Sequence, residues 1–250
     1  MKAEVKILIE GYTTADTIVD ISESKSRPTI TLVRDKDADI VMVVDPGALS
    51  DQQILIDSLK AEGLTVNDVN IVCVTHSHLD HYKNIGMFPK AKILEYFGLW
   101  NNETMVEWPE HFTENILILK TPGHDYSSIT LFVTTEIGKV AICGDVFWRE
   151  DSPTYDMYAT DQEKLKKSRV LVSKMADWII PGHGGMYKSK QLSSVITEQI
   201  KVVKNDLGKC RKCHRQLFVK KDRCECQPKL CYHCCECGVD CELCNCKHRR

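Results

Sequence analysis

The sequence has no long hydrophobic run, and it has almost no cysteine before residue 209. Apolar runs such as Ile40–Val44 are far too short to span a bilayer. The first residues, MKAEVKILIEGY, include the acidic Glu4 and Glu10 and lack the apolar stretch of a secretory signal. No internal repeat of fixed period or low-complexity linker is present. We therefore expect a cytoplasmic or nuclear chain without membrane contact.

The composition indicates a globular chain with a separate basic tail. The 250 residues are 43% hydrophobic and 27% charged, which allows a packed core and excludes a disordered chain. The composition changes abruptly after Asn205–Gly208, so we expect a main domain at 1–208 and a small module at 209–250. The module holds 11 Lys and Arg against 5 Asp and Glu, whereas the whole chain has a net charge of −2. The main domain is therefore acidic.

The tail also holds 11 of the 13 cysteines. They are Cys210, Cys213, Cys224, Cys226, Cys231, Cys234, Cys235, Cys237, Cys241, Cys244 and Cys246. Two residues between cysteines let both sulfurs reach one tetrahedral ion, so this spacing is typical of structural zinc sites. A module with so few aliphatic residues needs metal to fold, and we expect about two zinc ions there. Its basic residues indicate RNA or a protein as a partner.

Short runs rich in β-branched residues predict the strands of an α/β fold. The expected strands are Val5–Ile9, Thr29–Val33, Ile40–Val44, Val69–Val74, Ile116–Leu119, Ile129–Val133, Val140–Cys143 and Trp178–Ile180. Apolar residues at helical spacing predict helices within Asp51–Glu62, Gln162–Met175 and Gln191–Lys204. Several strands end at a His or an Asp, and strand-end loops on a rigid sheet can hold ligands accurately.

The motif HSHLDH at residues 76–81 carries the strongest chemical signal. In an extended backbone alternate side chains share a side, so His76, His78 and Asp80 are expected to project together. His81 joins them if a helix begins after Asp80, a residue suited to capping one. Imidazoles and carboxylates are the ligands of Zn²⁺ and of similar first-row divalent metals.

Three more candidate ligands follow other expected strands. His124 and His183 each come after a Pro-Gly pair, and Asp145 follows Val140–Cys143. Four groups within six residues cannot all reach one tetrahedral ion without strain, so seven ligands indicate two metal ions that share one group. Two ions at close range can hold a nucleophilic hydroxide at neutral pH.

These motifs, together with Asp45 in Val-Val-Asp-Pro-Gly, resemble the metallo-β-lactamase superfamily in order and spacing. The resemblance implies an αββα sandwich with a pair of zinc ions, or another divalent pair, at the edge between two sheets. It implies these metal ligands: His76, His78 and His124 on one ion, Asp80, His81 and His183 on the other, and Asp145 between them. It also implies that Asp45 orients a ligand from behind and that Asp80 orients the bridging hydroxide.

Secondary motifs indicate a substrate class. Asn84–Pro89, Gly144–Phe147 and Ser168–Leu171 resemble a group of the superfamily that is associated with hydrolysis of RNA phosphodiester bonds in histone pre-mRNA processing. The resemblance therefore implies an endoribonuclease.

Two alternatives stay open. A small-molecule thioester or lactone hydrolase uses the same metal set, and Tyr155 or Tyr158 could take the part of the tyrosine that lactone hydrolases place after the bridging Asp. A zinc-stabilised adaptor without activity is an interpretation from a different class, although every expected metal ligand is present.

Overall fold

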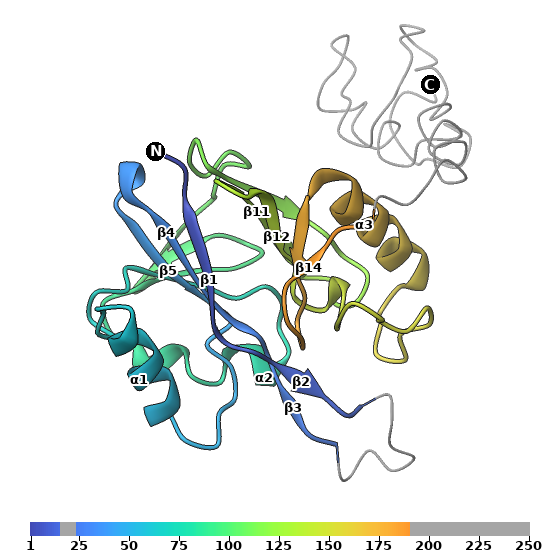
Figure 1. The fold of residues 1–250 in the computed structure, drawn as a ribbon, viewed down its shortest axis with the longest axis horizontal. Helices are drawn as coiled ribbons and strands as arrows, with labels where there is room; N and C mark the ends of the chain where they lie inside the picture. Colours follow the sequence, from blue (N-terminus) through green and yellow to red (C-terminus); the bar gives the residue numbers. More distant parts are fainter. Residues whose placement is uncertain (16–23, 191–250) are drawn as a thin grey trace, which may run out of the picture. The chain divides into compact units, whose positions relative to one another are not determined.

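Two β-sheets face each other and carry a helix on each outer side in the computed structural model, which describes residues 1–15 and 24–190 (Figure 1). The seven-stranded sheet has the order β1, β4, β5, β6, β7, β8, β9. Its strands are β1 (Glu4–Ile9), β4 (Ile30–Asp35), β5 (Ile40–Val44), β6 (Ile71–Cys73), β7 (Lys92–Leu94), β8 (Leu99–Asn101) and β9 (Thr104–Val106). β5, β6 and β7 are parallel to one another, and the other neighbours in this sheet are antiparallel.

The second sheet has five strands in chain order. They are β10 (Ile116–Lys120), β11 (Ile129–Thr135), β12 (Gly138–Ile142), β13 (Trp178–Ile180) and β14 (Tyr187–Lys188). β12 and β13 are parallel, so their carboxyl ends meet at one edge. A separate hairpin of β2 (Tyr12–Thr13) and β3 (Ser26–Arg27) projects from the sheets (Figure 1).

The main core lies between the two sheets. Fully buried side chains from both sheets pack together there, among them Val44, Leu94, Ile118 and Leu131. Burial of this apolar surface is the main favourable contribution to folding of the two layers. The predicted α/β fold with two sheets is confirmed.

Each outer sheet face is covered by a helix. α1 (Gln53–Ala61) buries Leu55 and Leu59 against the seven-stranded sheet. α3 (Gln162–Met175) buries Leu165 and Val172 against the five-stranded sheet. The spacings of four and seven residues place each pair on one helix face. The Asp161 side chain accepts a hydrogen bond from the Lys164 N–H and starts α3 at the predicted residue.

One predicted detail of the motif at 76–81 is wrong. α2 (Leu79–Tyr82) begins two residues earlier than expected, with His78 as its N-cap residue. Asp80 therefore lies inside the first helical turn and does not cap the helix. The helical turn rotates Asp80 away from the side that His76 and His78 share, which decides the grouping of the ligands below.

Short 3₁₀ turns complete the described elements. They cover Lys36–Ala38, Ile85–Met87 and Gly144–Val146. No helix among residues 1–15 and 24–190 is long and apolar enough to cross a membrane. The predicted helix at 191–204, the boundary after residue 208 and the cysteine-rich module lie outside the described residues.

Candidate metal centre

The predicted ligands meet at the edge where the ends of several strands converge. The segment His76–His81 follows β6, and Asp145 follows β12 within a 3₁₀ turn. His183 follows β13, and His124 lies in the loop between β10 and β11. Both sheets therefore contribute to the cluster, as expected from the strand-end positions in the sequence.

All seven side chains fall into two compact groups. Within each group, the candidate ligand atoms lie within 4.8 Å of one another. The first group contains His76, His78, His124 and Asp145, and the second contains Asp80, His81 and His183. The structure thus separates Asp80 from His76 and His78, contrary to the expectation from an extended backbone.

Asp145 lies between the two groups, and its two oxygens face different ones. Oδ2 is 3.3 Å from Nε2 of His124, and Oδ1 is 3.4 Å from Nε2 of His81. Both oxygens are 3.2 Å from Nε2 of His183. Burial raises the pKa of Asp145, but His183, His81 and His124 outweigh it and hold the pKa well below its usual value. The carboxylate is therefore ionised, with an oxygen available to each group.

Asp45 and Thr75 fix two of the imidazoles from behind. Nδ1 of His81 lies 2.8 Å from Oδ2 of Asp45, which is itself buried. Thr75 Oγ1 donates a hydrogen bond to Asp45 and lies 3.1 Å from Nδ1 of His76. Because the threonine hydroxyl has one hydrogen, it accepts the hydrogen on Nδ1 of His76. In the neutral rings, the Nε2 atoms of His76 and His81 therefore direct their lone pairs toward the centre.

Asp156 is a functional residue that the sequence interpretation missed. Its Oδ2 lies 2.7 Å from Nδ1 of His124, and its side chain is fully buried. Asp156 accepts a hydrogen bond from Nδ1 of His124 and so orients this ring, just as Asp45 orients the ring of His81. Asp156 lies in the irregular segment before α3, where no periodicity or motif marks it. Only the folded loop brings it to His124.

His183 and His78 complete the set in different ways. Nδ1 of His183 donates to the backbone carbonyl of Arg27 at 2.9 Å, so in the neutral ring the lone pair of Nε2 faces the centre. His78 presents its other nitrogen, because Nδ1 of His78 lies 3.0 Å from Nε2 of His124. His76, His81, His124 and His183 thus direct Nε2 toward the centre of the cluster. His78 directs Nδ1 toward it.

The cluster contains buried polar atoms that the protein itself does not satisfy. Nε2 of His76, Nε2 of His81 and Oδ1 of Asp145 are buried without a hydrogen-bond partner. An unpaired buried polar atom costs about 1–3 kcal/mol, so three of them in one place call for a ligand. Burial also lowers the pKa of His76 well below its usual value, which keeps this ring neutral. Neutral imidazoles and carboxylates in this number fit a pair of divalent first-row metal ions.

Two glycines make room for Asp145 and Thr75. A Cβ on Gly182 would lie 1.8 Å from Oδ1 of Asp145. Gly144 has a left-handed backbone with φ of +49°, and a Cβ there would lie 2.3 Å from Oγ1 of Thr75. These positions accept only glycine without displacing the cluster.

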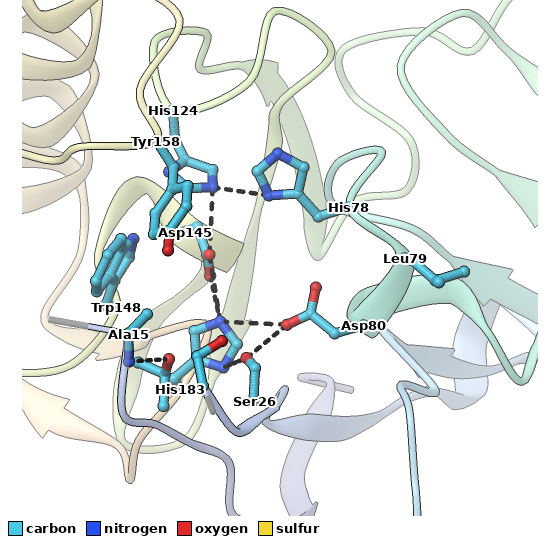
Figure 2. A pocket seen from close by; sticks show the side chains of 12 residues that line it. Ala15, Ser26, His78, Leu79, Asp80, His124, Asp145, Trp148, Tyr158 and His183 are labelled. Atoms are coloured by element: carbon cyan, nitrogen blue, oxygen red, sulfur yellow. Dashed lines mark hydrogen bonds and ion pairs between the residues drawn. The ribbon is translucent and has the colours of Figure 1, made fainter. Parts of the chain in front are cut away.

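A cavity of about 360 Å³ gives access to the cluster, and Figure 2 shows it from close by. Thr13, Ser24 and Ser26 from the β2–β3 hairpin segment contribute hydroxyls to its lining. The aromatic rings of Trp148 and Tyr158 also line it.

Asp80 extends into this cavity and accepts a hydrogen bond of 2.6 Å from Oγ of Ser26. The Asp80 side chain is 26% exposed and that of Asp145 is 6% exposed. Asp80 is therefore the carboxylate of the cluster that a substrate can reach.

Comparisons with known proteins agree with this architecture. Residues 26–119 match the family model of the metallo-beta-lactamase superfamily. The chain is 32% identical to metallo-beta-lactamase domain-containing protein 1 of Xenopus laevis, over 74% of this chain and 81% of that protein. It spans about six-tenths of the rat, mouse and human proteins of the same name.

Solved structures share the fold. A metallo-beta-lactamase-type protein of Thermotoga maritima superposes with a TM-score of 0.60 at 24% identity, over 75% of this chain and 100% of that one. A quorum-quenching N-acyl homoserine lactone lactonase superposes with a TM-score of 0.54 at 17% identity, over 73% of this chain and 91% of that one. The described fold, the two ligand groups and the sequence identity to the Xenopus protein place the chain in the metallo-β-lactamase superfamily, as a metal-dependent hydrolase.

Proposed function

We propose that the chain is a dinuclear phosphodiesterase that cleaves RNA. The observation that carries this proposal is the position of Asp145, whose two oxygens face two separate groups of buried ligand atoms. His76, His78 and His124 would hold one metal ion, Asp80, His81 and His183 would hold the other, and Asp145 would bind both.

Two bound divalent ions supply an activated water for attack on phosphorus and positive charge for the phosphodiester oxygens. The protein keeps the imidazoles in the state that this chemistry needs. Asp45 accepts from Nδ1–H of His81, and Asp156 accepts from Nδ1–H of His124. Each of these hydrogen bonds fixes the ring tautomer and aims Nε2 inward.

Asp80 is the proposed catalytic residue. Its Oδ2 lies 3.8 Å from Nε2 of His183 and 4.0 Å from Nε2 of His81, at the cavity side of the second group. From there the carboxylate can orient the attacking water and carry a proton toward the leaving oxygen. Ser26 holds one of its oxygens by a hydrogen bond, which limits rotation of the carboxylate.

RNA is the substrate that the sequence relationship favours. The stretches Asn84–Pro89, Gly144–Phe147 and Ser168–Leu171 carry the resemblance to RNA-processing members, and the Xenopus relative aligns with most of this chain. The cavity also offers the hydroxyls of Thr13 and Ser24, which can donate hydrogen bonds to phosphate oxygens.

The test compares the metal-loaded full chain with an Asp80→Ala, His81→Ala double variant on labelled single-stranded RNA. Loss of a proton carrier alone lowers rates about 10²- to 10⁴-fold, so we expect RNA cleavage to fall by at least this factor. Metal content and circular dichroism are measured in both proteins. RNA cleavage that persists in the double variant at the wild-type rate would contradict the proposal.

A lactone or thioester hydrolase is the second candidate. Tyr158 and Trp148 place an aromatic surface beside the ligand groups, and a solved lactonase shares the fold. A panel of lactones and thioesters is therefore assayed beside the RNA. Turnover of one of these esters, with no RNA cleavage by the same preparation, would replace the first candidate by the second.

The cysteine-rich tail has a separate proposed role. About two structural zinc ions bound by its cysteines would hold the module together, and its basic residues would contact RNA or a partner protein. A variant lacking residues 209–250 tests the contact. Unchanged RNA affinity and unchanged salt dependence in this variant would exclude the tail as the RNA contact.

A further inference from the structure

A second cavity adjoins the metal centre on the far side of the His76–His78 segment. It has a volume of about 230 Å³ and is lined by Tyr82, Tyr96, Ser77 and Ser127 among others. His76, a member of the first ligand group, is also among the residues that line it. The centres of the His76 and His78 rings are only 4.6 Å apart, and His78 lines the cavity that gives access to the ligand cluster. The two cavities are therefore neighbours in one active-site edge.

Tyr82 and Tyr96 line the second cavity, and two exposed aromatic residues are next to lining residues in the sequence. Phe97 lies edge-on to Tyr96 with ring centres 5.1 Å apart, and Phe97 is 55% exposed. Tyr126, which precedes the lining residue Ser127, is 61% exposed. Large aromatic side chains left open to solvent beside a cavity can form a stacking surface for flat rings.

A cation accompanies this aromatic surface. Nζ of Lys120 lies 4.0 Å from the centre of the Tyr96 ring and 5.8 Å from that of Trp108. Two carboxylates lie near this cavity. Asp125 is buried and accepts hydrogen bonds from the hydroxyls of the lining residues Ser77 and Ser127. The acidic residue of the lining, Glu95, is directed into its own turn. It accepts hydrogen bonds from the N–H groups of Phe97 and Gly98 and from the Trp100 indole. A lysine beside tyrosine rings suits a base with its attached phosphate better than an aliphatic acyl chain.

We propose that this cavity is a nucleobase subsite of the same active site. A base of single-stranded RNA, next to the phosphodiester held at the metal centre, stacks on Tyr96, and Lys120 contacts the neighbouring phosphate. This inference rests on the proposed function, because it assigns part of the RNA substrate to a second place on the same edge.

The first experiment separates binding from chemistry with the metal-loaded full chain on single-stranded RNA. Tyr96→Ala should raise KM about 5- to 100-fold, because this factor corresponds to the binding free energy of one stacked base. It should change kcat less than about twofold. Tyr96→Phe keeps the ring and should retain the wild-type KM. Lys120→Ala should flatten the slope of log KM against log salt by about 0.7, whereas the exposed Lys166→Ala should leave it unchanged.

The second experiment leaves the Tyr96 ring intact and removes the base from the RNA. RNA with one abasic nucleotide beside the cleaved bond should lose the same factor in KM as Tyr96→Ala loses on intact RNA. The two changes together should cost no more than either alone, because both delete one contact. The abasic RNA tests the wild-type protein, so this arm stands even if Tyr96→Ala fails to fold.

The outcomes distinguish the subsite from the function. RNA cleavage by the wild type, with equal KM for intact and abasic RNA, overturns the subsite and leaves the function in place. Additive effects of Tyr96→Ala and the abasic nucleotide also overturn it. Turnover of lactones or thioesters without RNA cleavage overturns both proposals, and a Tyr96→Ala effect on acyl-chain preference would then assign the cavity to the acyl group.

Discussion

The outward-facing nitrogens of the imidazoles govern the site as strongly as the inward-facing ones. Asp45, Thr75, Asp156 and the carbonyl of Arg27 each accept from one Nδ1. A neutral imidazole has one hydrogen, so a fixed acceptor on one side leaves a lone pair on the other. The acceptors therefore determine where the site can bind a metal ion.

Replacement of Asp156 should weaken metal binding without any change of a ligand. Asp156→Ala removes the acceptor behind His124, and loss of such a partner typically costs 10- to 100-fold in metal affinity. Asp156→Asn keeps an uncharged acceptor and should lose less. Competition with a chromophoric chelator measures the affinity. Asp151→Asn, which changes an exposed carboxylate in the same loop, serves as the control. Equal affinities in Asp156→Ala and wild type would refute the role of this residue.

Gly182→Ala should disrupt the bridging carboxylate directly. The added methyl group would lie 1.8 Å from Oδ1 of Asp145, so Asp145 or the backbone must move. We expect the metal content to fall below that of the wild type, measured by elemental analysis of dialysed protein. Gly86→Ala is the matched control, because a Cβ there meets no atom within 4 Å. An unchanged metal content in Gly182→Ala would show that Asp145 tolerates displacement.

At the scale of elements, α3 positions the irregular segment that carries Asp145 and Asp156. Arg169 on this helix donates through Nε to the Val146 carbonyl and through Nη1 to the Pro153 carbonyl, each at 2.8 Å. Its guanidinium also lies 5.6 Å from the centre of the Phe147 ring. The Arg169 side chain thus fixes the segment to α3 at two points, Val146 and Pro153.

Arg169→Met should loosen this segment and leave the sheets in place. Loss of hydrogen bonds to a charged group costs about 2 kcal/mol, which lowers Tm by roughly 4–8 °C in a domain of this size. Hydrogen exchange should increase between residues 146 and 156 more than in β11 or β12. The exposed Lys166→Met on the same helix is the control. Uniform exchange changes across the sheets would instead indicate a general loss of stability.

Long, regular elements could be predicted from the sequence, and so could short apolar strands such as β13 (Trp178–Ile180), whereas other short strands could not. α3 has the predicted bounds because its apolar spacing and its Asp161 cap agree. β8, β9 and the β2–β3 hairpin were missed because their two or three residues form no buried apolar run and show no periodicity. The seven ligand side chains could be named from the motifs, yet their grouping depended on where α2 begins. Asp156 could not be named, since its role arises only from the tertiary path of its loop.

For the whole molecule, metal binding and stability are linked. The cluster leaves three buried polar atoms without hydrogen bonds, and a metal pair would satisfy them. A ligand at about 100 times its Kd adds about 2.7 kcal/mol, so chelation should lower Tm by roughly 5–10 °C. Scanning fluorimetry with and without added metal measures the shift.

The tail could contribute to such a shift, so the control is the Asp80→Ala, His81→Ala variant, which keeps every tail cysteine. Its metal-dependent shift should be clearly smaller than that of the wild type. Equal shifts in the two proteins would assign the stabilisation to another part of the chain.

The ligands come from both sheets, with His76, His78 and His81 after β6 and with Asp145 and His183 on the second sheet. Bound ions would therefore act as a cross-link between layers that are otherwise held together by the apolar core and by hydrogen bonds such as those from Ile129 N–H to the Thr75 carbonyl and from Ala3 N–H to the Thr134 carbonyl. Cross-links formed late in folding slow unfolding more than they speed folding. The lifetime of the native state should then depend on metal supply, and metal release should precede separation of the two sheets.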